Sequence, residues 1–150
     1  MDVIALHAVT EDLAAYLSEA TVSDLGCPTP FRSWDLSELY LHLVEQNARI
    51  GSGIGRGSDD ASPAPAHVDR TTLSASAHLY GGGFEEQYRR TARVMENAFA
   101  AITDPREVRS VAGIPGDHAI AELYEMQIRD ALTHARNVAQ ALGLDYEPRS

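Results

Sequence analysis

Three residues of this chain carry side chains that could together hold a metal ion: His42, Asp130 and His134. Imidazole nitrogens and carboxylate oxygens are ligands for borderline divalent metals. Asp130 and His134 are four positions apart, which on a helix places them on one face, about 5–6 Å apart at Cβ. With His42 from a second helix, they would supply three protein ligands and leave coordination positions for water or substrate, as catalytic metal sites do.

The same three residues also have a simpler interpretation. An Asp and a His four positions apart form a common hydrogen bond or ion pair on a solvated helix face. A lone histidine on a helix flank, such as His42, is usually packed or at the surface. All three residues lie roughly a quarter-turn from the centre of the apolar stripe of their helices. Ligands lining a cleft and ordinary half-exposed polar residues both occupy such positions, so spacing alone leaves both interpretations open.

Apolar residues recur every three or four positions in four segments, which predicts four amphipathic helices. The helices are expected over residues 3–20, from 34–35 to the glycine run at 51–55, over 84–102 and over 118–142. Asp35 with Glu38 predicts a capping box at the second helix, Asp117 is predicted to cap the fourth, and Gly143 to end it. Residues 106–117 are predicted to form an extended connector, and strand content is expected to be small or zero.

A long segment of residues 51–83 separates the second and third helices and holds seven glycines, two prolines and five serines. A loop of this length inside a compact domain is usually functional or disordered. Four amphipathic helices with one long crossover predict an all-α four-helix bundle. A chain of 150 residues fits a single domain, which we expect over residues 1–150.

Composition excludes several classes of partner. With 22 acidic and 12 basic residues the net charge is −10, so nucleic acid and anionic membrane surfaces are expected to be repelled. Cys27 is the one cysteine, which excludes an internal disulfide and fits a reducing cytoplasm. The first residues lack the basic and apolar segments of a signal peptide, and no stretch approaches the roughly 20 apolar residues of a membrane span. We therefore expect a cytoplasmic protein with a small-molecule partner.

Two segments resemble a known family. Residues 27–43, CPTPFRSWDLSELYLHL, resemble the Thr-Pro, Trp-Asp, Leu and His-Leu segment of the DinB-like superfamily. The branch they resemble includes the metal-binding N-terminal domain of mycothiol-dependent maleylpyruvate isomerase. Residues 130–134, DALTH, look like the second ligand segment of that family, and residues 139–143, AQALG, like the end of its last helix. Two departures are Phe31, where the family often has cysteine, and Ala135-Arg136-Asn137 after the second histidine.

The resemblance implies a four-helix bundle with a divalent metal held by His42, Asp130 and His134. Zinc is the first expectation for the metal, with nickel or iron as alternatives. It further implies a thiol-dependent transferase or isomerase, with a low-molecular-weight thiol such as mycothiol as co-substrate, and a homodimer. The alternative is a non-catalytic homodimer that binds metal or a small ligand as a sensor, carrier or stress protein.

Several other residues carry expectations of their own. Gln46 and Asn47 are predicted to contact substrate, although Asn47 could instead be a hydrogen-bonded polar residue between helices. Trp34 is expected to anchor the second helix in the core, and Cys27 to pack in its loop. The remaining histidines are expected at the surface; they are His7, His67, His78 and His118. No side chain stands out as a general base.

Overall fold

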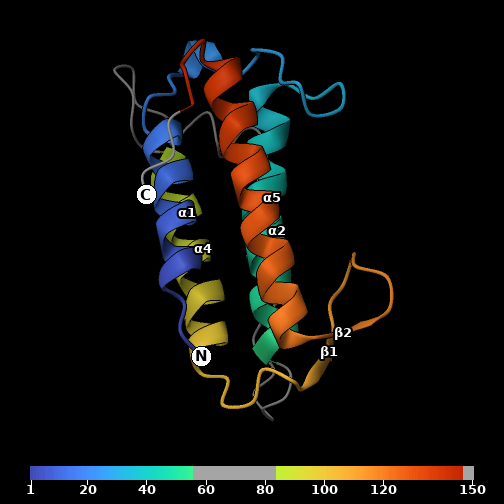
Figure 1. The fold of residues 1–150 in the computed structure, drawn as a ribbon. Coiled ribbons are helices and arrows are strands. Elements are labelled where there is room, and N and C mark those ends of the chain that lie inside the picture. The colour runs from blue at the N-terminus through green and yellow to red at the C-terminus, as the bar shows by residue number, and fades with distance from the viewer. Residues whose placement is uncertain (56–83, 147–150) are drawn as a thin grey trace.

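The computed structural model describes residues 1–55 and 84–146. Among these residues, four α-helices form a bundle in which α1 and α5 run in one direction and α2 and α4 in the other (Figure 1). Their bounds are Ile4–Leu17 for α1, Leu36–Gly55 for α2, Phe84–Ala100 for α4 and Ile120–Ala141 for α5. A short 3₁₀ helix, η1, spans Val22–Asp24, and two strands, β1 at Val108–Ser110 and β2 at Asp117–Ala119, precede α5. The expectation of an all-α bundle is confirmed, and in the described part of the chain this two-stranded sheet is the one addition to the helices.

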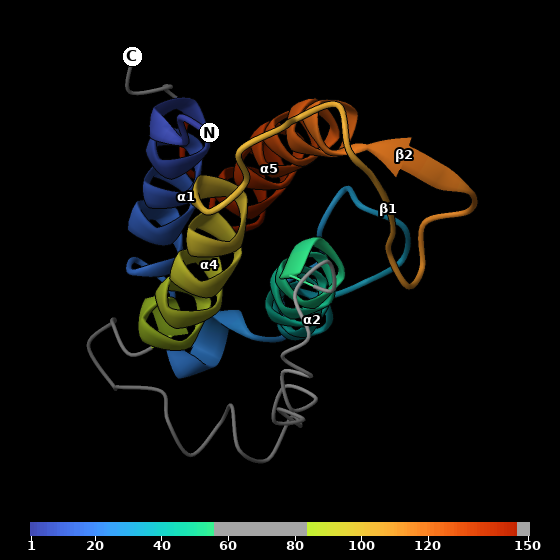
Figure 2. The same cartoon turned by 90° about the horizontal axis from the view of Figure 1, so that it is seen from below.

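The helices do not contact one another equally. α2 packs mainly on α4, and α1 packs on α5 and on α4, whereas α2 and α5 contact each other far less. Seen along the bundle axis, the hairpin of β1 and β2 stands beside α2 and α5, on the side away from α1 and α4 (Figure 2). The thinly packed boundary between α2 and α5, which we call the α2–α5 seam, is where the functional candidates lie.

The start of α2 is fixed by the predicted capping box. The Glu38 backbone N–H donates to Asp35 Oδ1 at 2.9 Å, and the Asp35 N–H donates to Glu38 Oε1 at 3.2 Å. Two N–H groups that the first helical turn leaves without partners are thereby satisfied. The preceding loop is closed by a bridge between Pro28 and Asp35, so its residues are held against the first turn of the helix.

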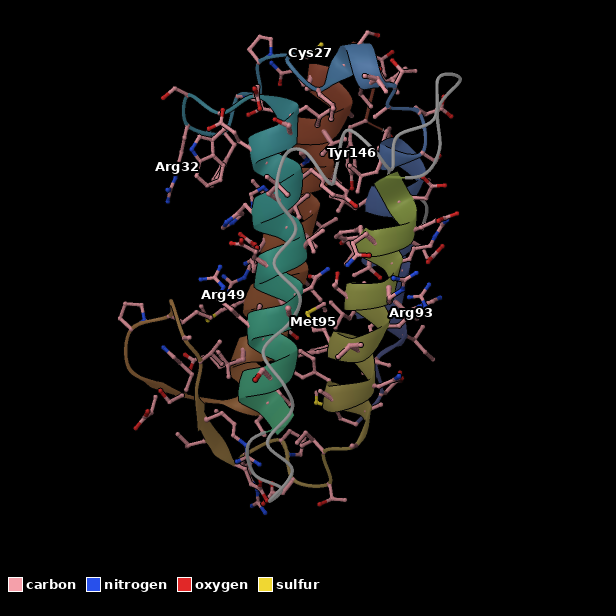
Figure 3. The ribbon with its side chains drawn as sticks, turned by 180° about the vertical axis from the view of Figure 1, so that it is seen from behind. Cys27, Arg32, Arg49, Arg93, Met95 and Tyr146 are labelled. Atoms are coloured by element: carbon pink, nitrogen blue, oxygen red, sulfur yellow. The ribbon has the colours of Figure 1, made fainter. Side chains whose placement is uncertain are left out.

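α2 reaches Gly55 and so ends in the glycine run, as predicted, although it includes residues 51–55 that were also expected to begin the crossover. Glycine weakens an isolated helix by about 1 kcal/mol relative to alanine. Here two of the glycines let neighbours come close: Gly51 lies against the Met95 backbone of α4 and Gly53 against Val111. The Met95 side chain fills the space between α2 and α4 (Figure 3). Tertiary packing therefore overrides the local preference.

The connector before α5 is also more ordered than predicted. β1 and β2 pair antiparallel, with Arg109 opposite His118, and Asp117 belongs to β2 instead of capping α5. The N-cap of α5 is Ala119, which makes no side-chain cap. The Ile120 N–H donates to the Glu107 carbonyl at 2.8 Å. Because backbone carbonyls satisfy the helix start, a side-chain cap at Asp117 is not needed.

The other predicted boundaries hold to within a few residues. α1 is shorter than 3–20, α4 ends two residues before 102, and α5 begins two residues after 118. Gly143 adopts a φ of +72° just beyond α5, as its predicted C-terminal role requires. The greater part of the predicted crossover, residues 56–83, lies outside the described residues. In the described part of the chain, no helix combines the length and the apolarity that crossing a membrane demands.

We predict that Gly53→Ala destabilises the fold. An ideal Cβ at Gly53 would lie 2.8 Å from Val111 Cγ2 and 3.3 Å from Val111 Cα. Relieving this overlap moves β1 away from α2, so we expect the free energy of unfolding to fall by about 1–2 kcal/mol. Urea unfolding followed by circular dichroism measures the change.

The matched control is Gly55→Ala, since nothing lies within 4 Å of a Cβ added there. This variant should be neutral or gain a few tenths of a kcal/mol, about what helix propensity supplies near a helix end. Equal stabilities for the two variants would show that Gly53 does not mediate a close approach.

Candidate functional site

The α2–α5 seam brings His42, Asp130 and His134 together. His42 lies in the second turn of α2, and the ring centroids of His42 and His134 are 5.7 Å apart. His134 Nε2 is 3.4 Å from Asp130 Oδ2, one turn earlier on α5. Two predicted helix faces thus meet at these three side chains, as the spacing analysis expects. Their role as metal ligands remains a prediction.

Aromatic rings from the loop before α2 enclose the two imidazoles. The Phe31 ring lies 4.7 Å from the His134 ring, edge to face, and 5.9 Å from the His42 ring. The Trp34 ring lies 5.2 Å from the His42 ring. Trp34 is therefore half-buried against the site, which corrects the expectation that it anchors the core. Phe31, which sequence analysis noted only as a departure from the family, packs its ring on both histidines.

Burial and charge set the protonation of the site. Burial, the neighbouring His134 and the guanidinium groups of Arg49 and Arg32 lower the pKa of His42, against the opposing effect of Asp130. A lowered pKa keeps the His42 imidazole neutral, with a nitrogen lone pair available to a ligand. Burial acts to raise the pKa of Asp130, but the adjacent His134 and a hydrogen bond from Gln46 outweigh it and hold the carboxyl below its ordinary value.

His134 is buried and has a ring nitrogen without a hydrogen bond in the described chain. Its side chain is 1% exposed, and its Nε2 has no hydrogen-bond partner among residues 1–55 and 84–146. Its Nδ1 lies 3.5 Å from the Asn137 amide nitrogen. A buried polar atom without a partner costs about 1–3 kcal/mol, so such atoms are uncommon and often mark function.

The three side chains do not form a closed ligand set as they stand. No group of three or more His, Cys, Asp and Glu side chains within the described ranges is arranged to hold a metal ion. Two of the three side chains contact other groups. Asp130 Oδ2 accepts a hydrogen bond from Gln46 Nε2 at 2.6 Å, and the His42 ring is packed between Phe31 and Trp34.

Two arginines lie on the side of α2 that faces the hairpin. Figure 3 shows Arg32 on the loop before α2 and Arg49 further along the helix. The Arg32 guanidinium lies 5.2 Å from the centroids of both the Phe31 and Trp34 rings. Within the described part of the chain, Arg32 is the one non-glycine residue with positive φ, at 54°. Backbone conformations of this kind are often found at functional sites.

The two predicted substrate-contact residues are placed differently. Gln46 lies one turn after His42, bonds Asp130 and lines a pocket in the seam. Asn47 is 2% exposed and donates to Thr91 Oγ1 of α4 at 3.3 Å. Asn47 is thus a hydrogen-bonded polar residue between helices, which is the second of its two expected roles, and it does not line the pocket.

The pocket has a volume of about 140 Å³ and lies beside the histidines, between α2, α5 and the hairpin. Its apolar lining consists of Ile50, Ile114, Leu123 and Met126. Its polar lining consists of Gln46, Gln127 and Asp130. Gln127 was passed over in the sequence; its position three residues before Asp130, on the same line of α5, is the signal that could have identified it.

The other candidate residues lie away from the seam. His7 Nδ1 is 2.8 Å from Glu96 Oε1 in a polar cluster that joins α1 to α4 through Arg93 and Glu11. Cys27 is half-buried in its loop. His67 and His78 lie outside the described residues.

His118 holds the loop that carries Ile114. Its Nδ1 lies 3.0 Å from Glu122 Oε2 and its Nε2 lies 2.9 Å from the Pro115 carbonyl. Both neighbours are acceptors, so both bonds form only when the imidazole is protonated. The Pro115 carbonyl first, and then Glu122, raise the pKa of His118 above its ordinary value of 6.5.

We therefore predict that protonated His118 secures this loop. Because the pKa is raised in the folded state, the stabilisation is complete below pH 6.5 and is lost as the pH rises through the folded pKa. Amide exchange at residues 111–117, corrected for its intrinsic pH dependence, should become faster at high pH. An NMR titration of the imidazole should give a lower His118 pKa in Glu122→Gln than in the native chain.

Glu125→Gln, an exposed change on the same helix, should leave the His118 pKa where it is. If the Glu122 variant also leaves it unchanged, the carboxylate does not hold the imidazole in solution.

Comparisons with known proteins place this chain in a family. The family model described as mycothiol maleylpyruvate isomerase N-terminal domain matches residues 6–139. Two similar proteins of Mycobacterium tuberculosis are uncharacterized protein MT0763 of strain CDC 1551 / Oshkosh and uncharacterized protein Rv0738 of strain ATCC 25618 / H37Rv. Each is 26% identical over 145 residues, which cover 95% of this chain and 69% of the relative.

The family match includes both helices of the seam, the loop before α2 and the hairpin, and so contains His42, Asp130 and His134. The four-helix architecture agrees with the fold that the sequence resemblance implies. This chain belongs to the family of mycothiol maleylpyruvate isomerase N-terminal domains.

Proposed function

We propose that this protein binds one divalent metal ion, zinc first, through His42, Asp130 and His134, and acts on a low-molecular-weight thiol as a transferase or isomerase. The family name associates such domains with mycothiol, which supports a thiol as the small-molecule partner. A cytoplasmic location and a homodimer belong to the same proposal.

The observation that carries the proposal is the unpartnered Nε2 of His134. This nitrogen is buried, faces the Asp130 carboxylate at 3.4 Å, and lies beside a second imidazole 5.7 Å away between ring centroids. A cation placed there would satisfy Nε2 and the carboxylate together. Two imidazoles and one carboxylate are a donor set that suits zinc, and also nickel or iron.

The three side chains have the chemistry of metal ligands and lie close together. They must still move before all three can bind one ion. The described side chains do not yet form a metal-holding group, since Gln46 occupies Asp130 Oδ2 and His42 is packed between aromatic rings. Asp130 is partly exposed, with 38% of its side chain accessible, so its carboxylate can turn without disturbing the core. Gln46 would then hydrogen-bond the Asp130 carboxylate and hold it in position, as partners of metal ligands commonly do.

The bound ion would lower the pKa of a thiol and so favour the nucleophilic thiolate near neutral pH. The chain itself supplies the surroundings. Phe31 and Trp34 exclude water from one side of the histidines, and the Arg32 guanidinium over those rings adds positive charge that favours a thiolate. The lowered pKa of His42 keeps its imidazole unprotonated, so no proton competes for its lone pair.

The first test is metal binding. Protein freed of metal with a chelator and titrated with zinc should bind about one equivalent. Trp34, the one tryptophan of the chain, lies beside His42 and should report the titration by its fluorescence. Loss of a ligand in His134→Ala or Asp130→Asn should weaken zinc binding by at least about tenfold, since even indirect partners of metal sites are worth that much.

His118→Ala is the matched control, because it removes a histidine from the hairpin and should leave zinc affinity unchanged. Asp130→Asn hardly changes the size of the side chain, so it tests the site even if the variant of the buried His134 does not fold. Circular dichroism checks the fold of both variants. Zinc binding of native strength in Asp130→Asn and in folded His134→Ala would refute the site.

The second test concerns the thiol. Mycothiol added to the zinc-loaded protein should change Trp34 fluorescence with saturation, and the change should be absent in the metal-free protein. An analogue of mycothiol with its sulfur methylated separates recognition of the thiol from recognition of the rest of the molecule. Equal responses with and without zinc would leave the metal proposal standing and overturn the thiol-dependent chemistry.

A further inference from the structure

Arg49 is a half-buried cation without an acidic partner in the described part of the chain. Its Nε is buried and makes no hydrogen bond among residues 1–55 and 84–146. Four other arginines each pair with a carboxylate: Arg89, Arg93, Arg106 and Arg109. A buried N–H of a charged group costs free energy when it has no acceptor. Arg49 is therefore placed to gain from an anion that supplies one.

The Arg49 guanidinium lies beside the pocket between α2, α5 and the hairpin. A Cβ added at Gly113 would collide with Arg49 Nη1, so the guanidinium rests against the backbone of the loop between β1 and β2. The next residue in each of these two segments, Ile50 and Ile114, lines the pocket. Figure 3 shows Arg49 pointing away from α4, to the side of α2 on which the hairpin stands. This contact thus lies at the rim of the pocket.

The orientation of the guanidinium leaves one edge for a ligand. Nη1 is the atom that lies against Gly113. Nε and Nη2 form a second edge, and two parallel N–H groups of this kind match the two oxygens of a carboxylate. A carboxylate on that edge would give the buried Nε its missing acceptor and would balance the charge.

The pocket favours an apolar body attached to that carboxylate. Its apolar lining consists of Ile50, Ile114, Leu123 and Met126. The volume of about 140 Å³ is close to the roughly 150 Å³ of a protein cavity that holds benzene. A single ring, or a short chain of similar size, therefore fits.

The orientation of such a ligand follows from Arg49. Asp130, the acidic residue among those that line the pocket, lies toward the histidines and accepts its hydrogen bond from Gln46, about one turn of α2 before Arg49. A guanidinium keeps its proton under all ordinary conditions in proteins. Arg49 therefore attracts a carboxylate to its own end of the pocket whether Asp130 is ionised, protonated or bound to a metal.

We propose that Arg49 binds the carboxylate of a small organic acid whose apolar body occupies this pocket. This goes beyond the proposed function, in which neither Arg49 nor a carboxylate ligand takes part. Because the binding requires no metal, it is measured on the metal-free protein.

The test compares benzoate with benzamide, a neutral molecule of the same shape. Each is titrated into protein with labelled isoleucine methyl groups, and the signals of Ile50 and Ile114 are followed by NMR. Benzoate should bind at least about tenfold more tightly, as a charge-assisted hydrogen bond allows. Inorganic phosphate, which has no apolar body, should leave these signals unchanged at the concentration that saturates the protein with benzoate. Equal affinities for benzoate and benzamide, or an equal response to phosphate, would overturn the proposal.

Arg49→Met is the decisive variant, because it keeps an unbranched apolar stem and removes the guanidinium. Its affinity for benzoate should fall to that for benzamide. Arg49→Lys keeps the charge but not the paired donors, so its preference for benzoate should be intermediate. Arg90→Met, an exposed change on α4 with the same effect on net charge, is the control and should keep the preference.

A guanidinium that only supports the hairpin predicts a different result. Arg49→Met would then lose benzamide binding together with benzoate binding, and that outcome overturns the proposal. A benzoate preference of native size in Arg49→Met also overturns it. Zinc titration at about pH 8, where ordinary histidines are neutral, should give the same affinity for Arg49→Met and the native protein. Failure of this site and failure of the metal site are therefore separate results.

Discussion

The close approach of α2 to its neighbours through Gly51 and Gly53 is the constraint on which the arrangement depends. Without side chains at these positions, the helix backbone lies against Met95 of α4 and against Val111 just after β1. α2 therefore packs closely on α4 and near the hairpin, and it makes few contacts with α5. A bundle whose four helices packed equally would bury this boundary with apolar side chains. Here histidines, carboxamides and a carboxylate share this boundary with apolar side chains.

The seam contains a buried polar atom that lacks a hydrogen bond. His134 Nε2 has no partner within the described chain, and its side chain is buried. Such an atom opposes folding, so it is maintained at the expense of stability. It lies on α5 at the boundary with α2, beside the imidazole of His42. The simplest physical account is that a ligand completes its hydrogen bonding.

Family membership and the geometry of the seam answer different questions. The family match establishes the kind of domain, and the two mycobacterial relatives share about a quarter of its residues along nearly all of this chain. The chemistry of the seam is argued from this chain's own side chains. Phe31, which the sequence analysis noted only as a departure from the family, shows why both are needed: its ring packs on both histidines.

The sequence by itself determined the helices and the N-terminal cap of α2, and its resemblance to a family singled out His42, Asp130 and His134. Periodicity and the Asp35–Glu38 pair act within one or two turns, so local spacing suffices to predict them. Tertiary structure alone decided that α2 continues through its glycines, that Ala119 and not Asp117 begins α5, and that Asn47 faces α4. Each of these depends on a partner distant in the chain: Met95 and Val111, the Glu107 carbonyl, and Thr91. The packing of such distant segments supplies energies comparable to local propensities, and local patterns do not contain it.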